Sequence, residues 1–232
     1  MGVDRLALLR EGDIEVIGRV VGSSNATFVV ALTHGDDHAW AIYKPVVGER
    51  PLADFEPGLH RRERAAYLLS EWLGWGLVPE TVVREEAPAG VGSLQWFVEG
   101  DPTHHHFTLV RDPARHDDLR RIAVFDVVAN NTDRKSGHVL LGVDGRVWAI
   151  DHGLCFSVHA RLRTVIWDFA GQAVPGDLTT ALARLAHSVP DEVAELLATA
   201  EVAALRVRAE RLLAAGVLPE DVTGFGHPWP LV

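Results

Sequence analysis

The sequence predicts a two-lobed α+β protein. Alternating, β-branched segments dominate the first part of the chain, whereas Leu/Ala/Val periodicity typical of helices dominates after residue 153. A polar stretch at 100–113 separates the strand-rich first part of the chain from the mainly helical second part. We therefore expect one domain made of an N-terminal lobe at 1–100 and a mainly helical C-terminal lobe at 101–232, with a cleft near residues 98–115.

The N-terminal lobe is expected to hold an antiparallel sheet and one long helix. Apolar periodicity of the helical kind predicts that helix at 59–73, where Pro57 and Gly58 precede the pattern. The turn at 34–37 predicts a hairpin between two of the strands. The expected strands lie at 15–21, 27–32, 39–44, 81–84 and 93–98, after a short helix at 4–10.

The C-terminal lobe is expected to be helical, with a small two-stranded insertion. The Asp144-Gly145 turn predicts a hairpin between strands at 139–142 and 147–150. The expected helices lie at 116–129, 178–187, 191–198 and 202–214.

Composition narrows the class of function. The formal net charge of −10 argues against a general nucleic-acid surface and against stable association with anionic membranes. Cys155 is the single cysteine, so an internal disulfide is impossible and a reducing cytoplasm is the expected location. The first ten residues include Asp4 and lack a long apolar run, so we expect no signal peptide there.

Two carboxylates carry the strongest functional signal. Asp133 lies in a polar loop, Asn-Asn-Thr-Asp-Arg-Lys-Ser-Gly-His, that follows an apolar helix, and Asp151 ends the next apolar run. Phosphoryl transfer needs one carboxylate to orient an acceptor hydroxyl and another to hold the metal on the nucleotide phosphates. Asp133 is the candidate for the first role and Asp151 for the second, and Arg134 is a candidate for neutralising charge beside Asp133.

Residues upstream supply candidate nucleotide contacts in a matching order. The turn at Ser23, Ser24 and Asn25 offers small residues and hydroxyl donors to phosphate oxygens. Lys44 ends the following strand, and Glu63 on the next helix is the expected ion-pair partner that directs it, with Glu56 as the competitor.

Each of these features also has an ordinary structural explanation. Gly-Ser-Ser is common in hairpin turns, Lys44 fits a surface lysine at a strand end, and Asp133 fits a turn aspartate. Their common order along the chain is what favours function. The run at 104–106 is three adjacent histidines, which cannot all face one ion, so no dedicated transition-metal site is expected there.

The chain resembles the phosphatidylinositol 3-/4-kinase-like superfamily, most closely the type II phosphatidylinositol 4-kinases, with HipA-type and secretory-pathway kinases as more distant relatives. Asn-Thr-Asp-Arg at 131–134 and Ile-Asp-His-Gly at 150–153 are the specific motifs. The resemblance implies a protein-kinase-like fold that binds ATP with Mg²⁺, or Mn²⁺ as an alternative. It implies phosphate contacts from Lys44, and Asp133 and Asp151 as the catalytic aspartate and the metal ligand. The adenine pocket that it implies is lined by Gln95, Trp96, Phe97 and Val98.

Two departures from the family pattern limit what carries over. His138 occupies the place where the family has an asparagine as second metal ligand. We expect His138 to hold the metal together with Asp151, although imidazole prefers softer ions than Mg²⁺. The cysteine-rich lipid-anchoring segment is also missing, so we expect an acceptor hydroxyl on a protein or a small soluble molecule. The alternatives are a catalytically weak nucleotide-binding scaffold, or an enzyme that transfers AMP.

Overall fold

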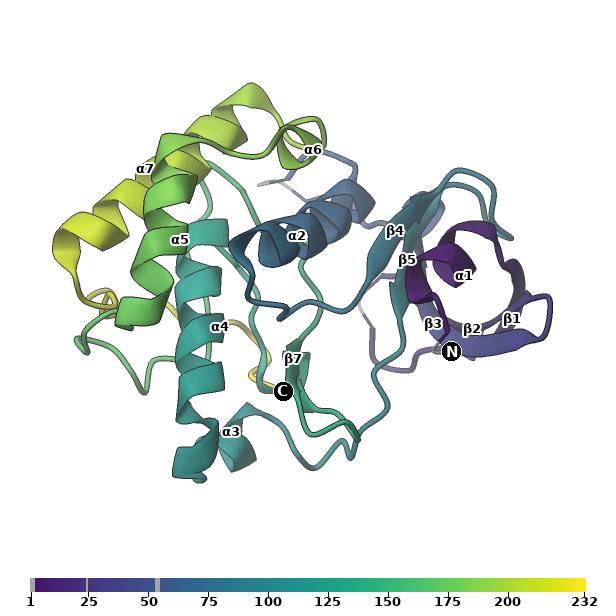
Figure 1. Cartoon of the computed structure of the whole chain (residues 1–232), viewed down its shortest axis with the longest axis horizontal. Helices are drawn as coiled ribbons and strands as arrows, with labels where there is room; N and C mark the ends of the chain where they lie inside the picture. The colour runs from purple at the N-terminus through teal and green to yellow at the C-terminus, as the bar shows by residue number, and fades with distance from the viewer. Residues whose placement is uncertain (1–2, 24, 53–54) are drawn as a thin grey trace.

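The computed structural model, which describes residues 3–23, 25–52 and 55–232, has the expected two-part α+β architecture (Figure 1). A five-stranded antiparallel sheet with one short helix forms one end of the molecule, and a larger body of helices forms the other. The strands are β1 (Asp13–Arg19), β2 (Phe28–His34), β3 (Asp37–Pro45), β4 (Thr81–Arg84) and β5 (Gly92–Trp96), in the spatial order β1-β2-β3-β5-β4.

One face of the sheet is closed by α1 (Arg5–Glu11). Asp4 caps this helix by accepting a hydrogen bond from the Ala7 amide, which satisfies one of the free donors of its first turn. Leu8 and Leu9 are buried there with Val30 and Leu94 of the strands in a small apolar cluster. Strand residues of the other parity therefore point to the opposite face, toward the helical body.

The opposite face is only partly covered, by α2 (Leu59–Leu73), which has the predicted bounds. This helix packs on β4 and β5, and its apolar side chains belong to the large cluster of the helical body. Gly58 and Gly74 have positive φ at its two ends, where a side chain would be strained. The β1–β3 part of this face remains open toward the cleft, and Trp40 is 50% exposed there.

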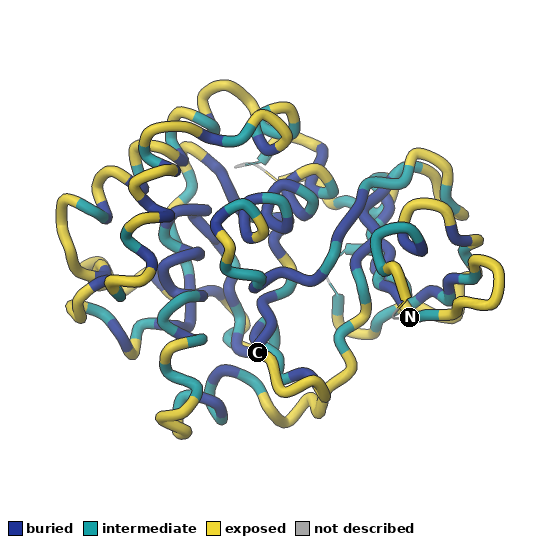
Figure 2. Tube along the Cα trace, viewed as in Figure 1, coloured by how far each residue is buried: buried dark blue, intermediate teal, exposed yellow. Residues whose placement is uncertain are grey.

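The helical body contains the largest apolar cluster, and Figure 2 shows exposed positions mainly on its outer turns and loops. Its helices are α3 (His106–Leu109), α4 (His116–Ala129), α5 (Gly176–His187), α6 (Asp191–Ala194) and α7 (Thr199–Ala215). The hairpin of β6 (Val139–Leu141) and β7 (Val147–Ala149) and the 3₁₀ turns at Val46–Gly48, Pro113–Arg115 and Ser136–His138 complete the described elements.

One predicted helix is longer than the structure allows. The prediction at 191–198 is wrong beyond Ala194, because Ala198 already caps the next helix: its amide donates to the Glu201 carboxylate, 3.0 Å away. The short α3 was not predicted, since four residues carry too little periodicity to be seen.

The connection between sheet and helical body runs through residues 97–105. The Val143 amide donates to the Glu99 carbonyl at 2.8 Å, and Gly100 bridges Gly142, so the linker is tied to the β6–β7 hairpin. The boundary near residue 100 that the sequence predicts falls within this linker. Among the described residues, none of the helices has both the length and the apolar character needed to cross a bilayer.

Candidate active site

Three charged side chains from three elements meet at the cleft. The Lys44 ammonium at the end of β3 lies 2.5 Å from Glu63 Oε1 on α2 and 2.8 Å from Asp151 Oδ1 after β7. The expected pair of Lys44 with Glu63 is thus confirmed. The competitor Glu56 instead offers its backbone carbonyl to Arg62. Glu63 also accepts a hydrogen bond from the His152 amide, at 3.0 Å, so α2 is joined to the turn that carries Asp151.

The opposite charges in this cluster favour the ionised forms of Lys44 and Asp151. Burial acts to lower the pKa of Lys44, but the carboxylates of Asp151 and Glu63 outweigh it and raise that pKa above its ordinary value. Burial acts to raise the pKa of Asp151, but Lys44 and His138 hold it far below the usual range. Burial raises the pKa of Glu63, against the opposing charge of Lys44. Asp151 is therefore a carboxylate, and Lys44 a cation, throughout the neutral pH range.

The backbone at Asp151 is held in an uncommon conformation. Its φ of 59° lies in the left-handed region, which non-glycine residues seldom adopt. The β6–β7 hairpin on one side and the buried His152 on the other hold the residue there. Strain of this kind is typical of sites where a side chain must be aimed, and here it turns the carboxylate toward the cleft.

The loop that carries Asp133 is fixed by its neighbours. The Asn131 side chain accepts from the Asp133 amide at 2.9 Å and donates to Asp126 at 3.1 Å. Thr132 donates twice to the Leu154 carbonyl, through its amide and its hydroxyl. Asp133 is therefore presented on a rigid loop, with its carboxylate 28% exposed.

The Asp133 carboxylate has the properties of a group that can accept a proton near neutral pH. Burial raises its pKa to about 6, assisted by the like charge of Asp151 and opposed by Lys135, whose ammonium lies 3.4 Å away. A general base is most effective when its pKa is close to the working pH. From the sequence, we assign no role to Lys135. Its position two residues after Asp133 is the feature of the sequence that could have indicated one.

The expectation that Arg134 neutralises charge at the reacting groups needs correction. Its side chain is fully buried and forms a multiple ion pair with Asp126, with the closest contact at 2.9 Å. It also donates to the carbonyls of His138 and Ile150 and lies 2.8 Å from His152 Nε2. Arg134 thus holds the Asp133 loop against the Asp151 turn, and cannot touch a substrate.

His138 lies where a second metal ligand was expected. Its Nε2 is 3.4 Å from Asp151 Oδ2, and its Nδ1 is 3.1 Å from the Asp133 carbonyl. Burial lowers the pKa of His138 to about 4, so the ring is neutral. The Lys135 amide donates to the same Nδ1 at 3.4 Å, and Nε2 faces the Asp151 carboxylate.

These side chains fit a nucleotide-bound cation better than a cage made by the protein. Asp151 supplies a hard oxygen and His138 a nitrogen, and the described residues hold no group of three or more His, Cys, Asp or Glu side chains with metal-site geometry. Mg²⁺ is commonly held by one or two protein ligands, with substrate phosphates and water completing the shell. The arrangement agrees with that mode of binding.

A cavity between sheet and helical body gathers most of the predicted phosphate-end residues. Its walls include Ser23, Asn25, Lys44, Glu63, Asp133 and Asp151. The Ser23 hydroxyl lies 2.8 Å from Thr27 Oγ1, and the Asn25 side chain accepts from the Arg50 amide at 3.0 Å. Ser24 lies outside the described residues.

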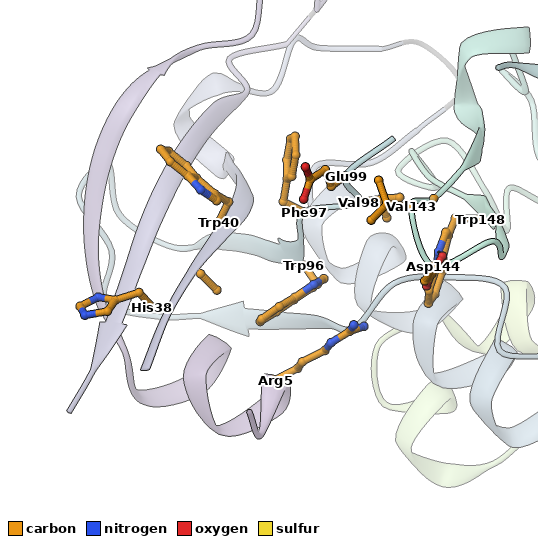
Figure 3. Close-up of a pocket in the computed structure, with 12 residues that line it drawn as sticks. Arg5, His38, Trp40, Trp96, Phe97, Val98, Glu99, Val143, Asp144 and Trp148 are labelled. Carbon is orange, nitrogen blue, oxygen red and sulfur yellow. The ribbon is translucent and has the colours of Figure 1, made fainter. Parts of the chain in front are cut away.

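A second cavity, of about 270 Å³, lies at the other end of β3, beside the linker (Figure 3). Trp40, Phe97, Val98 and Val143 are among its walls. Trp40 and Lys44 lie on one face of β3, four residues or about 13 Å apart along the strand. This spacing suits an extended nucleotide, with its base at the linker and its phosphates at Lys44.

The remaining predicted base contacts are placed differently. The Gln95 side chain is buried and donates to Thr81 Oγ1 at 2.8 Å, so its amide is engaged within the sheet. The Trp96 ring packs on the α1 face, with the Arg5 guanidinium 4.8 Å from its centroid (Figure 3). Trp96 nevertheless lines the same linker cavity as Trp40 and Phe97, from the α1 side of the sheet, so its place beside a base stays a prediction.

Comparison with known proteins shows the family to which the chain belongs. The family described as phosphatidylinositol 3- and 4-kinase matches residues 60–212. Protein Rv2133c of Mycobacterium tuberculosis is 42% identical over 265 aligned positions, which cover 98% of this chain and 95% of that protein.

Two solved structures share the fold at low sequence identity. The Golgi casein kinase, crystallised with Mn/ADP bound, aligns with a TM-score of 0.54 and 15% identity, over 98% of this chain and 79% of that one. The hydra Fam20 structure with sugar aligns with a TM-score of 0.55 and 14% identity, over 90% of this chain and 86% of that one. The likeness extends over both the sheet and the helical body.

Proposed function

This chain belongs to the phosphatidylinositol 3- and 4-kinase family, and we propose on that premise that it transfers the γ-phosphoryl group of ATP to a hydroxyl of a protein or small soluble molecule. The proposed cofactor is Mg²⁺, with Mn²⁺ as the alternative. The observation that carries the proposal is one cavity in which Lys44, Glu63 and Asp151 form a charged cluster beside Asp133.

The proposed chemistry assigns each side chain a separate task. Asp133 accepts a hydrogen bond from the acceptor hydroxyl and takes its proton as the new bond forms. Lys44 neutralises phosphate oxygens, and Glu63 keeps the ammonium aimed at them. Lys135, 3.4 Å from Asp133, places a further positive charge where the γ-phosphoryl group would arrive.

Asp151 and His138 are the residues that would hold the cation. When bound, the cation would supply electrostatic stabilisation of the charge that develops on the transferred group. The Golgi casein kinase, whose fold is similar, was crystallised with Mn/ADP, which supports a nucleotide and a divalent cation at the corresponding cleft. The single cysteine, Cys155, is buried, which fits the proposed cytoplasmic location.

The proposal is tested by titrating ATP into the protein calorimetrically with Mg²⁺, and then with Mn²⁺. We expect cation-dependent binding that falls at least tenfold in Asp151→Ala and is retained in Asp133→Asn, because Asp133 acts on the acceptor. Asp36→Asn, in the exposed β2–β3 turn, is the control for a lost carboxylate. Absence of ATP binding with both cations would refute the proposal.

The same proteins also distinguish phosphoryl transfer from the two alternatives, a nucleotide-binding scaffold and an AMP transferase. Binding without any turnover would identify a nucleotide-binding scaffold. If turnover occurs, the intact mass of the labelled acceptor distinguishes an added phosphoryl group from an added AMP. Full turnover by Asp133→Asn would contradict the role given to that carboxylate.

A further inference from the structure

A cavity of about 660 Å³ lies next to the phosphate-end cavity, and we name it the α2–α7 groove. It is bounded by residues 55–58, by the first turn of α2, by residues 157–159 and by the entry to α7. A volume of this size is typical of ligand sites, which span about 300–1,000 Å³.

The groove continues two walls of the phosphate-end cavity. Leu59 and His60 at the start of α2 line that cavity, and Gly58 and Arg61 of the same turn line the groove. On the facing side, residues 153–154 line the cavity and residues 157–159 line the groove. The linker cavity lies at the opposite end of β3. A molecule in the groove therefore approaches the phosphates from the side away from the base.

The segment at 157–159 is also joined to the loop that carries Asp133. Asn130, which ends α4 with a positive φ, donates from its side chain to the carbonyls of Ser157 and Ala160, at 2.8 and 3.0 Å. Three residues further along the chain is Asp133. The wall of the groove and the proposed base thus belong to one hydrogen-bonded unit.

The charges lining the groove are balanced. Two arginines, Arg61 and Arg62, and two glutamates, Glu56 and Glu201, line it, and Arg62 Nη2 lies 2.7 Å from Glu201 Oε1. A site for a polyanionic headgroup needs uncompensated positive charge. Balanced charge favours an acceptor without multiple negative charges.

The other surfaces of the groove are apolar. The apolar side chains include Phe55, Val158, Leu196 and Leu197. The Arg62 guanidinium is held by the Glu201 carboxylate and the Glu56 carbonyl, and it lies 5.4 Å from the centroid of the Phe55 ring.

We propose that the α2–α7 groove binds a peptide segment of a protein acceptor, beside the serine or threonine that receives the phosphoryl group. A peptide offers apolar side chains to Val158 and Leu197, and its uncharged backbone suits a groove whose lining charges are balanced. In the reaction, the hydroxyl oxygen bonds to the γ-phosphorus, the bond to the β–γ bridging oxygen breaks with its electrons leaving on ADP, and the hydroxyl proton passes to Asp133. The inference rests on the proposed function and narrows its acceptor.

The test uses the full-length protein with γ-labelled ATP and three acceptors. These are a positional-scanning library of serine and threonine peptides, vesicles containing phosphatidylinositol, and free inositol. The variant is Val158→Glu in the groove, and Val207→Glu on α7 is the matched control, because the two valines are 40% and 39% exposed. ATP binding and ATP hydrolysis are measured on every variant.

We expect label on peptides, with a preference for an apolar residue near the acceptor. We also expect Val158→Glu to lower kcat/KM for peptide at least tenfold, with ATP affinity unchanged and Val207→Glu equal to wild type. Three results would each refute the proposal that the groove binds a peptide acceptor. The first is label on vesicles or inositol but not on peptides, and the second is an equal rate of peptide labelling in Val158→Glu and wild type. The third is ATP hydrolysis without label on any acceptor. If the wild-type protein does not bind ATP, the proposed function is refuted, and the proposal of a peptide-binding groove is refuted with it.

Discussion

Replacing Asp133 by asparagine should make the folded protein more stable at neutral pH while removing the proposed base. In the fold, burial and the neighbouring Asp151 raise the pKa of Asp133 to about 6, from an ordinary 3.8. The folded state therefore binds this proton more tightly than the unfolded chain does. By linkage, the contribution of Asp133 to stability falls as pH rises from about 4 to about 6 and stays low above that range.

The size of the effect follows from the shift. About two pH units at 1.36 kcal/mol each give about 3 kcal/mol, and the 28% exposure of the side chain reduces this to about 1–3 kcal/mol. For a chain of this length, that corresponds to a rise in Tm of about 3–10 °C at pH 8. Because wild type recovers the difference on protonation, the gap at pH 4.5 should be about a third of that at pH 8.

The assay is urea denaturation at pH 8 and at pH 4.5, without nucleotide and with a chelator present. Asp36→Asn, in an exposed turn, serves as the control and should show no pH-dependent gain. A variant no more stable than wild type at pH 8 would refute the reasoning. A gain of equal size at both pH values would refute it too, since the effect would then come from something other than the charge of Asp133.

Three further substitutions test other parts of the site. Asp126→Ala leaves Arg134 buried without its partner, so urea denaturation should show a loss of about 3–5 kcal/mol; a loss below 1 kcal/mol would contradict the scaffold role. Lys135→Met should lower kcat at least tenfold with little change in ATP affinity by calorimetry, because its charge lies beside Asp133; a changed affinity with unchanged kcat would place Lys135 on the nucleotide instead. His138→Asn replaces a nitrogen with an oxygen ligand, so the ratio of Mg²⁺-supported to Mn²⁺-supported ATP affinity should rise, and an unchanged ratio would remove His138 from the cation site.

Much of the fold could be predicted because its elements have strong local signals. The helix at 59–73 and the helix at 116–129 have the predicted bounds, since each has long apolar periodicity and a clear end. The helix at 191–194 was predicted too long, because a capping interaction at Ala198 depends on a side chain three residues further on. Such contacts are not visible in periodicity.

The sequence predicted which residues lie at the candidate site better than it predicted what each side chain contacts there. The Lys44–Glu63 pair followed from the order of elements, and the structure confirms it. Whether Arg134 faces substrate or core depended on Asp126, which lies eight residues earlier in the last turn of α4 and carried no signal of its own. The direction of Trp96 depended on which face α1 covers, and that is set by tertiary packing.

The two contacts of Lys44 have a consequence for how the cleft is used. Lys44 and Glu63 both precede the linker at 97–105 and Asp151 follows it, so the ion pair of Lys44 with Asp151 joins the two parts across the cleft. An arriving triphosphate would compete with Asp151 for this ammonium, and the carboxylate it releases would be left for a cation. Binding of the nucleotide and of the cation would therefore be coupled: the phosphates would replace Asp151 as the partner of Lys44, and the cation would replace Lys44 as the partner of Asp151.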